Sequence, residues 1–181
     1  IETFWDDQQC VFVNNLPWIN EEGGVRYDDR SLAVSILYNQ CPDENMKKAV
    51  DILANCPGEM GLSYPCNAGW RYWALVKVGR TDVVVGDFYS RWLAMESVQY
   101  NTTLQEDWHA SPDSVAQWSH CCVVPTYLLY TGILGIRPTS PGFKTCEIKP
   151  QPGGICDFKA VAKTVSGDIL FDVINNGGKY T

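Results

Sequence analysis

The sequence predicts a mainly α-helical chain: antiparallel helical hairpins over residues 1–138, then the opening strands of an antiparallel β domain over 139–181. Apolar residues recur at intervals of three and four through most of the first part, which is typical of helices that pack one face on a core. The period changes at the Gly- and Pro-rich stretch 135–142. Beyond it, short β-rich runs are separated by Pro and Gly, as in antiparallel strands.

Residues that favour helix ends bound most of the helical runs. A capping Asp, a Pro or a Gly stands where each apolar period starts or stops. The spacing of Val85, Phe88, Trp92 and Met95 predicts a buried stripe on one helix. We expect helices from Asp28-Asp29 to Cys41-Pro42, from Met46 to Leu53 with a stop at Pro57-Gly58, from Asn67 to Val78 closed by Gly79, from a cap at Thr81 or Asp82 through Met95, from Asp113 to Trp118, and from His120 to Leu134 with a kink at Pro125.

The regions outside these helices divide into a loop and three strands. A polar loop is expected from Gln99 to Pro112, between apolar helices. The β-rich runs predict strands over Lys144–Lys149, Asp157–Val165 and Asp168–Ile174. Asn175–Gly178 is typical of a hairpin turn.

Composition limits the classes of function. The chain has 181 residues, 45% of them hydrophobic, with seven Trp, so it can bury a core. Its net charge is 14 − 21 = −7, which leaves too few cations for a face that binds nucleic acid or an anionic membrane. The longest apolar runs, such as Val83-Val84-Val85, have three or four residues, whereas a membrane-spanning helix needs about 20.

The eight cysteines have no spacing that is typical of a zinc site. Cys121 and Cys122 follow His120 directly, but adjacent side chains on a helix point in different directions and chelate poorly. We therefore expect buried free thiols and no metal. The compartment is left open, extracellular, periplasmic or cytoplasmic, because the sequon Asn101-Thr102-Thr103 bears only on a secretory protein.

Both ends of the sequence suggest a segment of a longer protein. Residue 1 is Ile, and no signal segment follows it. At the other end, only Lys179–Thr181 follow the predicted hairpin turn. We expect both ends to be cuts, with a missing N-terminal part of the same protein as a partner.

The polar loop holds the residues best suited to chemistry. Glu106 and Asp107 lie beside Trp108, and an indole can cover one face of a sugar while a carboxylate handles a proton or positions water. The alternative is that the carboxylates stabilise a helix N-terminus and that Trp108 packs. Trp70 follows a Pro- and Asn-containing loop and is the better candidate to face a cleft, whereas Trp73 lies near the predicted core stripe.

Several short motifs resemble one family of enzymes. Thr102–Trp108 is similar to the Thr-Thr-(apolar)-Trp-Glu-x-Trp motif of the α-L-rhamnosidases, glycoside hydrolase family 78. Ser119-His120, Leu134–Pro138, Pro141–Lys144 and Ile148–Gly153 resemble further landmarks of that family, in the same order. The resemblance extends from about Asp29 to Ile174.

This resemblance implies a fold and an activity. The family has a six-hairpin (α/α)6 toroid followed by a C-terminal antiparallel β domain, and it hydrolyses terminal α-L-rhamnosides with inversion. By motif position, Glu106 resembles the general base, while Trp108 and His120 resemble residues that line the sugar subsite. Each has an alternative, a packing role for Trp108 and a capping or core role for His120. No metal or organic cofactor is implied.

Two departures separate this chain from the family pattern. Gln105 stands where the motif has Trp, which bears on the shape of the subsite. The acid motif Asp-x-x-x-Arg-x-Glu-Arg is absent; Asp28-Asp29-Arg30 is interpreted as a helix cap, although Tyr27 and Arg30 could face a sugar. The acid is therefore expected upstream, and this chain alone is expected to be inactive. The alternatives are a non-catalytic carbohydrate-binding relative, another glycosidase or a polysaccharide lyase.

Overall fold

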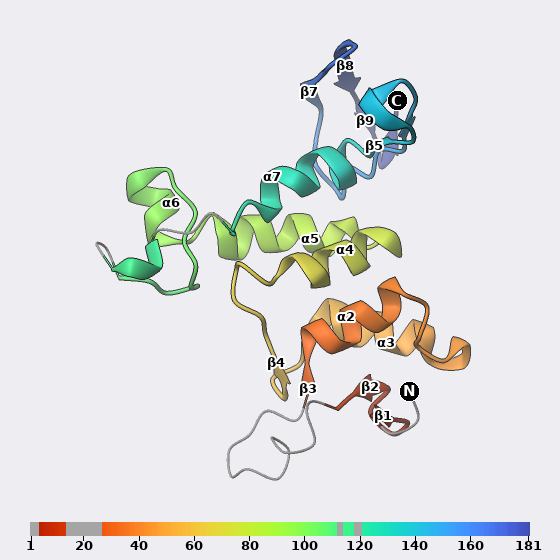
Figure 1. Cartoon of the computed structure of the whole chain (residues 1–181), viewed down its shortest axis with the longest axis vertical. Helices are drawn as coiled ribbons and strands as arrows, with labels where there is room; N and C mark the ends of the chain where they lie inside the picture. Colours follow the sequence, from red (N-terminus) through yellow and green to blue (C-terminus); the bar gives the residue numbers. More distant parts are fainter. Residues whose placement is uncertain (1–3, 14–26, 112–113, 118–120) are drawn as a thin grey trace.

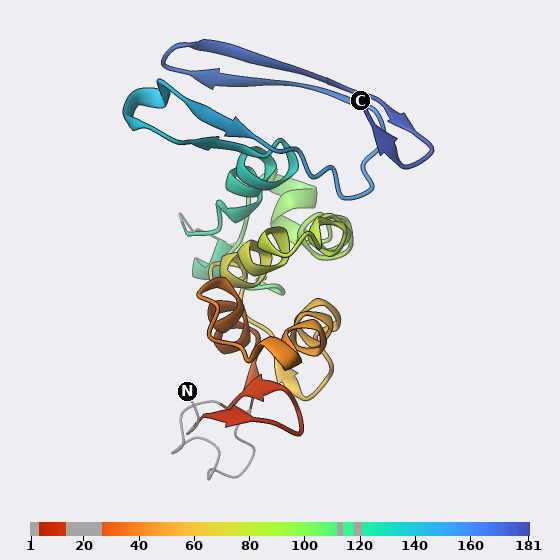
Figure 2. The same cartoon turned by 90° about the vertical axis from the view of Figure 1, so that its right-hand side faces the viewer.

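The computed structural model describes residues 4–13, 27–111, 114–117 and 121–181. The helices lie between short N-terminal strands at one end of the molecule and strand hairpins at the other (Figure 1, Figure 2). The α-helices are α2 (Asp29–Leu37), α3 (Met46–Asn55), α4 (Gly69–Lys77), α5 (Thr81–Asp87), α6 (Glu96–Asn101) and α7 (Val124–Leu128). The π-helical turns η2 (Phe88–Trp92) and η4 (Leu129–Ile133) continue α5 and α7, and the 3-10 turns are η1 (Asp43–Asn45), η3 (Val115–Gln117) and η5 (Pro141–Phe143).

Three helices, α2, α4 and α7, run in the same direction. At their C-terminal ends, Lys77 of α4 donates to the carbonyls of Ile36 and Leu37 in α2. At their N-terminal ends, a Cβ on Gly69 of α4 would lie 3.0 Å from the Val124 side chain of α7. The strands that lead into α2 and α4, β3 (Tyr27–Asp28) and β4 (Met60–Gly61), pair in parallel. The loops that enter these helices are therefore gathered at one end of the bundle.

Helices α3 and α5 run in the opposite direction on either side of α4. Arg71, in the first turn of α4, donates to the carbonyls of Leu53 and Ala54 at the end of α3. The same guanidinium pairs with Asp87, the last residue of α5. A cation at the C-terminal end of α3 is favoured by the helix dipole. These contacts establish the up-and-down arrangement of helical hairpins that the sequence predicts.

One core holds the hairpins together. Its fully buried side chains include Leu32, Ile36, Leu53, Tyr72, Leu75 and Met95. Trp92 is buried in the same core and donates its indole N–H to the Tyr72 hydroxyl over 3.0 Å. In the part of the chain that the structure describes, no helix is long and apolar enough to cross a membrane.

The C-terminal strands form antiparallel hairpins. The longest pair is β7 (Phe158–Thr164) with β8 (Gly167–Val173), and the shorter pairs are β5 (Ile136–Pro138) with β6 (Cys146–Ile148) and β9 (Asn175–Asn176) with β10 (Lys179–Tyr180). At the N-terminal end, β1 (Trp5–Asp6) pairs with β2 (Val11–Phe12). The small core of the C-terminal hairpins is built on Leu134, Ile136 and Ala162.

Two glycines join these hairpins to the helices. Gly135 has a φ of +65°, and a Cβ there would lie 1.8 Å from the Lys149 carbonyl oxygen. Gly153 has a φ of +61°, and a Cβ there would lie 2.7 Å from the carbonyl oxygen of Thr81 in α5. The Thr81 hydroxyl also donates to the Gln151 amide oxygen over 2.7 Å. The division into units 1–138 and 139–181 stays a prediction.

The structure corrects some of the predicted helix ends. Pro125 lies in the first turn of α7, where its missing N–H is tolerated, so it begins the helix and introduces no kink. Neither Thr81 nor Asp82 caps α5: the N-cap position is Arg80, and no side chain there caps the helix. The expected polar loop begins later than Gln99, because α6 continues to Asn101. The predicted helix at 113–118 is described only as the 3-10 turn η3.

The cysteine thiols are partly as expected. Cys10 and Cys41 are buried and free, whereas Cys156 is free but exposed. Cys56 and Cys66 are free and half-buried. Among the described residues, no three His, Cys, Asp or Glu side chains lie together in a group that could hold a metal ion.

Candidate functional site

The loops at the N-terminal ends of α2, α4 and α7 form the candidate site. Asp28 ends the strand before α2, Ser63 lies in the loop before α4, and Glu106 and Trp108 lie in the long loop before α7. Figure 1 shows α6 and the segment after it at the end of the bundle where α7 begins. Loops held by packed helices are suited to carry binding and reacting groups.

Asp28 and Asp29, at the start of α2, make different contacts. Asp28 is the N-cap: its carboxylate accepts from the backbone N–H of Ser31 over 2.8 Å, which confirms the predicted cap. Asp29 is fully buried, and its Oδ1 accepts from the backbone N–H and the hydroxyl of Ser63, over 3.1 and 2.5 Å. Burial raises the pKa of the Asp29 carboxyl, against the opposing effect of the Ser63 hydrogen bonds.

Trp108 is half-buried and is held on several sides. Its indole N–H donates to the Ser63 carbonyl over 2.9 Å. Its ring meets the Trp92 ring edge to face, with centroids 5.4 Å apart, and the Arg91 guanidinium lies 5.0 Å from its centroid. These contacts fix the plane of the indole, since a hydrogen bond, a ring contact and a cation act on different parts of it. Trp108 thus packs against the core while part of it stays exposed.

Gln105 anchors the loop that carries Glu106. It is fully buried, and its amide oxygen accepts from the backbone N–H of Ser97 in the first turn of α6 over 3.1 Å. Its amide nitrogen donates to the carbonyl of Asp107 over 2.7 Å. A glutamine can serve both bonds because its amide carries a donor and an acceptor. The residue in place of the family's Trp is therefore part of the scaffold of this loop.

The Glu106 side chain is exposed, whereas that of the preceding Gln105 is buried. Its backbone N–H donates to the Ala116 carbonyl over 2.7 Å. Within the described residues, its carboxylate has no hydrogen bond and no ion pair, so it is open to a substrate or water. Its negative charge reaches the loop before α4: the pKa of the Cys66 thiol is raised by burial first and by the Glu106 carboxylate next.

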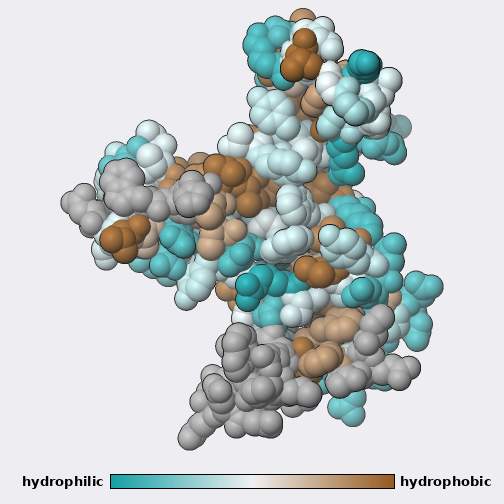
Figure 3. Space-filling model, viewed as in Figure 1, coloured by the Kyte–Doolittle hydropathy of each residue, from teal (hydrophilic) through white to brown (hydrophobic). Residues whose placement is uncertain are grey.

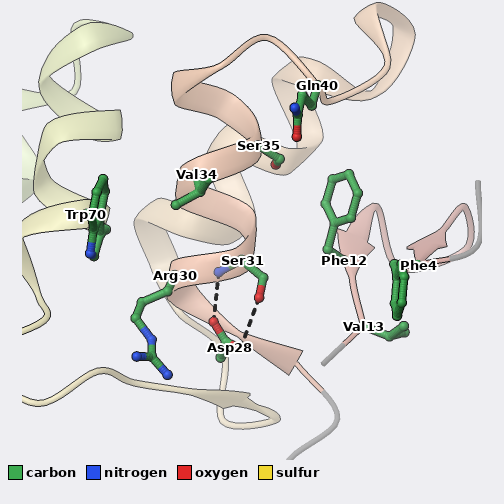
Figure 4. A pocket seen from close by; sticks show the side chains of 10 residues that line it. All are labelled: Phe4, Phe12, Val13, Asp28, Arg30, Ser31, Val34, Ser35, Gln40 and Trp70. Atoms are coloured by element: carbon green, nitrogen blue, oxygen red, sulfur yellow. Dashed lines mark hydrogen bonds between the residues drawn. The ribbon is translucent and has the colours of Figure 1, made fainter. Parts of the chain in front are cut away.

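Trp70 lines a separate cavity along α2. The cavity has a volume of about 570 Å³, within the range of small-molecule sites. Figure 4 shows Trp70 and Arg30 on one side of α2 and Phe4 and Phe12 on the other, with Val34 on the helix between them. Glu106 and Trp108 do not line this cavity.

Trp73 faces outward, contrary to the prediction that it belongs to the core stripe. Trp70 and Trp73 are equally exposed, at 36%, and their rings meet edge to face at 5.3 Å. Both line a second cavity of about 460 Å³ with Tyr127. The buried face of α4 is instead formed by Arg71, Tyr72 and their neighbours one turn on. The buried face of α4 includes an arginine, so it differs from the face that the apolar residues predict. Periodicity of apolar residues alone does not predict a buried arginine.

The structure brings together only some of the predicted site residues. Glu106 and Trp108 share one loop, Trp70 lies in a different cavity, and His120 lies outside the described residues. Sequence reasoning missed Ser63 and Arg91, which hold Trp108. The spacing of Asp87 and Arg91 by four residues indicates a pair on one helix face, but nothing local to Ser63 marks its role.

Comparison with solved structures supports the predicted resemblance. A GH78 family rhamnosidase of Bacillus sp. GL1 aligns over 93% of this chain with a TM-score of 0.72 and 22% sequence identity. The chain has the fold of a segment of a GH78 rhamnosidase. An α-L-rhamnosidase of Streptomyces avermitilis, solved in complex with L-rhamnose, aligns over 84% with a TM-score of 0.57 and 19% identity.

The likeness extends over a small share of those rhamnosidases. This chain covers 19% of the Bacillus protein and 16% of the Streptomyces protein. No protein-family model and no curated protein sequence matches the chain. At these identities, the rhamnosidase-like fold is established, and the chemistry has to be argued from the side chains.

Proposed function

We propose that this chain is part of a glycoside hydrolase that cleaves terminal α-L-rhamnosides or a related deoxyhexoside with inversion. One observation carries the proposal: the Glu106 carboxylate is exposed, has no ion pair or hydrogen bond among the described residues, and lies two residues from a partly exposed indole, in a chain with the rhamnosidase-like fold. An indole suits the apolar face of a sugar ring, and a carboxylate suits the activation of water.

Each residue has a role in this reaction. Glu106 removes a proton from the water that attacks the anomeric carbon, and the leaving oxygen takes a proton from a carboxylic acid on the opposite face of the sugar. In inverting enzymes the two carboxyl groups are separated by about 6.5–9.5 Å. Trp108 stacks on the ring, and His120 and Trp70 contact the sugar or its aglycone. No cofactor takes part.

The acid and the rest of the toroid would come from the preceding part of the same protein. The small share of the solved rhamnosidases that the chain covers supports this arrangement. So does the surface of α7, where Val123, Tyr127, Leu129 and Tyr130 are exposed. Figure 3 shows apolar side chains gathered at the surface near the start of α7. In a closed toroid, a neighbouring hairpin would cover such a face. This chain without that part is expected to be inactive.

Release of a chromogenic aglycone from an aryl α-L-rhamnoside tests the proposal. The assay uses the polypeptide that holds this chain and the part before it. Glu106→Gln removes the base and is expected to lower kcat about 10²- to 10⁴-fold. Glu96→Gln, on the exposed start of α6, is the matched control and leaves kcat unchanged. An unchanged kcat in Glu106→Gln would refute the base assignment. With a uronic-acid polysaccharide as the substrate instead, an unsaturated product that absorbs in the ultraviolet would indicate a lyase.

A non-catalytic, carbohydrate-binding role is the second candidate. It is favoured by the 570 Å³ cavity, which has an aromatic wall at Trp70 and a cation at Arg30 and lies apart from Glu106. Titration with L-rhamnose distinguishes the two. Binding that is lost in Trp70→Ala and kept in Glu106→Gln, with no hydrolysis by the wild-type polypeptide, would favour the binding role.

A further inference from the structure

The buried carboxyl of Asp29 has no role in capping α2, because Asp28 is the cap. Asp29 Oδ1 accepts both side-chain and backbone donors of Ser63, and Oδ2 has no hydrogen-bond partner among the described residues. Within the described ranges, Arg71 makes no ion pair with Asp29, because its guanidinium bonds the carbonyls of Leu53 and Ala54 and the carboxylate of Asp87. Among the described residues, the Asp29 carboxyl therefore has hydrogen bonds with Ser63 alone.

Ser63 connects Asp29 to Trp108 by hydrogen bonds. Both of its donors point to Asp29, and its carbonyl accepts the Trp108 indole N–H. A segment fixed by two hydrogen bonds at one buried oxygen offers its carbonyl in one orientation, and the indole follows that orientation. Asp29 lies 34 residues before Ser63, and Ser63 lies 45 before Trp108, so the link joins the first residue of α2 to the loops before α4 and α7.

We infer that Asp29 is a positioning residue, which sets the orientation of the Trp108 indole through Ser63 for stacking on the sugar. The part of the inference that concerns a sugar rests on the proposed function. The hydrogen-bonded link from Asp29 through Ser63 to Trp108 does not depend on it. Arg91 lies over the ring and Trp92 meets it edge to face, whereas the link from Asp29 acts on the indole N–H. Its role is that of a hydrogen-bond acceptor, and an asparagine supplies the same acceptor in the same place.

Fluorine NMR of the protein labelled with 5-fluorotryptophan tests the link without any substrate. Trp108→Phe identifies the Trp108 signal, and the Trp73 signal is an internal reference, because its ring packs against Trp70 and Tyr127 on the exposed face of α4. In Asp29→Ala, the Trp108 signal is expected to move or broaden beyond its line width while Trp73 stays in place. Asp29→Asn is expected to restore it.

Two further variants keep the test decisive. Asp28→Ala removes the cap at the same helix end without touching Ser63, and it should leave the Trp108 signal in place. Ser63→Ala removes one donor to Asp29 and should move that signal by less than Asp29→Ala; it also decides the matter if Asp29→Ala does not fold. An unmoved Trp108 signal in folded Asp29→Ala or in Ser63→Ala, or an equal shift in Asp28→Ala, would overturn the inference.

Kinetics separate this inference from the proposed function. A displaced stacking residue weakens binding of substrate and transition state alike, so Asp29→Ala should raise KM about three- to tenfold with little change in kcat. Glu106→Gln has the opposite pattern, a lowered kcat. A loss of kcat at constant KM in Asp29→Ala would contradict a positioning role. If no rhamnoside is hydrolysed by the wild-type polypeptide, the proposed function fails and the NMR result still decides the link.

Discussion

Replacing Arg71 by Met removes the ion pair that ties three helices together. Arg71 is a buried charge with a 3% exposed side chain, and it pairs with Asp87, which is 17% exposed. It also donates to the carbonyls of Leu53 and Ala54, over 2.9 Å each. Methionine keeps most of the aliphatic stem and its packing while losing all these donors.

The expected loss follows from what the substitution leaves behind. Removing one partner of a buried ion pair costs about 3–5 kcal/mol, because the remaining charge stays desolvated. The Asp87 carboxylate keeps only the Tyr72 hydroxyl at 3.1 Å and a long contact with Arg91 at 3.9 Å. The two carbonyls at the end of α3 lose their donor as well, so the upper part of that range is expected.

Urea unfolding, followed by tryptophan fluorescence and circular dichroism, measures the free energy of unfolding. Arg80→Met is the matched control, since Arg80 is 36% exposed and pairs with Asp82 on the surface, where such a pair is worth about 0–1 kcal/mol. If Arg71→Met and Arg80→Met agree within about 1 kcal/mol, the central role of the Arg71–Asp87 pair is refuted. Adding Asp87→Leu to Arg71→Met should recover part of the loss, because it removes the stranded charge.

Three other outcomes are expected. Gly153→Ala should lower the free energy of unfolding by about 2 kcal/mol or more, because its Cβ would lie 2.7 Å from a carbonyl oxygen of α5. A Cβ at Gly154 meets nothing within 4 Å, so Gly154→Ala should cost only the strain of a left-handed backbone. Calorimetry compares the two variants, and equal losses of stability would contradict the close approach at Gly153. The native state holds the Asp29 proton more tightly than the unfolded chain, so the contribution of Asp29 to stability should fall as the pH rises above 3.8 toward the raised pKa. Urea midpoints measured across this interval should therefore fall less, or rise more, with pH in Asp29→Asn than in the wild type, and equal slopes would contradict the raised pKa. Glu106→Gln should lower the pKa of the Cys66 thiol and speed its alkylation, read by peptide mass spectrometry, and an unchanged rate would place the carboxylate elsewhere.

The sequence predicts α4 and the β7–β8 hairpin well because their signals are local. Gly79 has a φ of +80° directly after the C-cap residue of α4, as the pattern of apolar residues followed by Gly indicates. The predicted strands 157–165 and 168–174 differ from β7 and β8 by one residue at each end. In both cases the residues that decide the structure lie within a few positions of one another.

The positions of the Trp73 and Thr81 side chains could not be predicted from the local sequence. Trp73 shares its helix face with Trp70 and Lys77, and the core face was taken by Arg71 because two other helices supply it with acceptors. Thr81 resembles a cap, but its hydroxyl bonds Gln151, which is 70 residues away. A side chain whose partner lies that far along the chain cannot be assigned from spacing.

In the candidate site, too, local features are predicted from the sequence and distant contacts are not. The motif around Glu106 predicts which loop carries the exposed carboxylate and the indole, since both lie within one short run. The residues that hold the indole N–H, Ser63 in the loop before α4 and Asp29 at the start of α2, are found only when α2, α4 and α7 are placed side by side. The motif thus predicts which candidate residues share a loop, whereas the contacts that hold them come from distant parts of the chain.

Gln105 stands where the family motif has Trp, and its contacts show what this difference changes in the loop. It lies on the buried side of the loop and bonds a helix-end N–H and a loop carbonyl at once, a pair of contacts that an indole, which is a donor only, cannot make. The next residue, Glu106, lies at a bend in the chain, and its side chain is exposed. The change at position 105 therefore alters how the loop is anchored and leaves the carboxylate exposed. The departure at position 105 therefore leaves intact the motif position on which the proposed base role depends, because this chain has Glu at position 106.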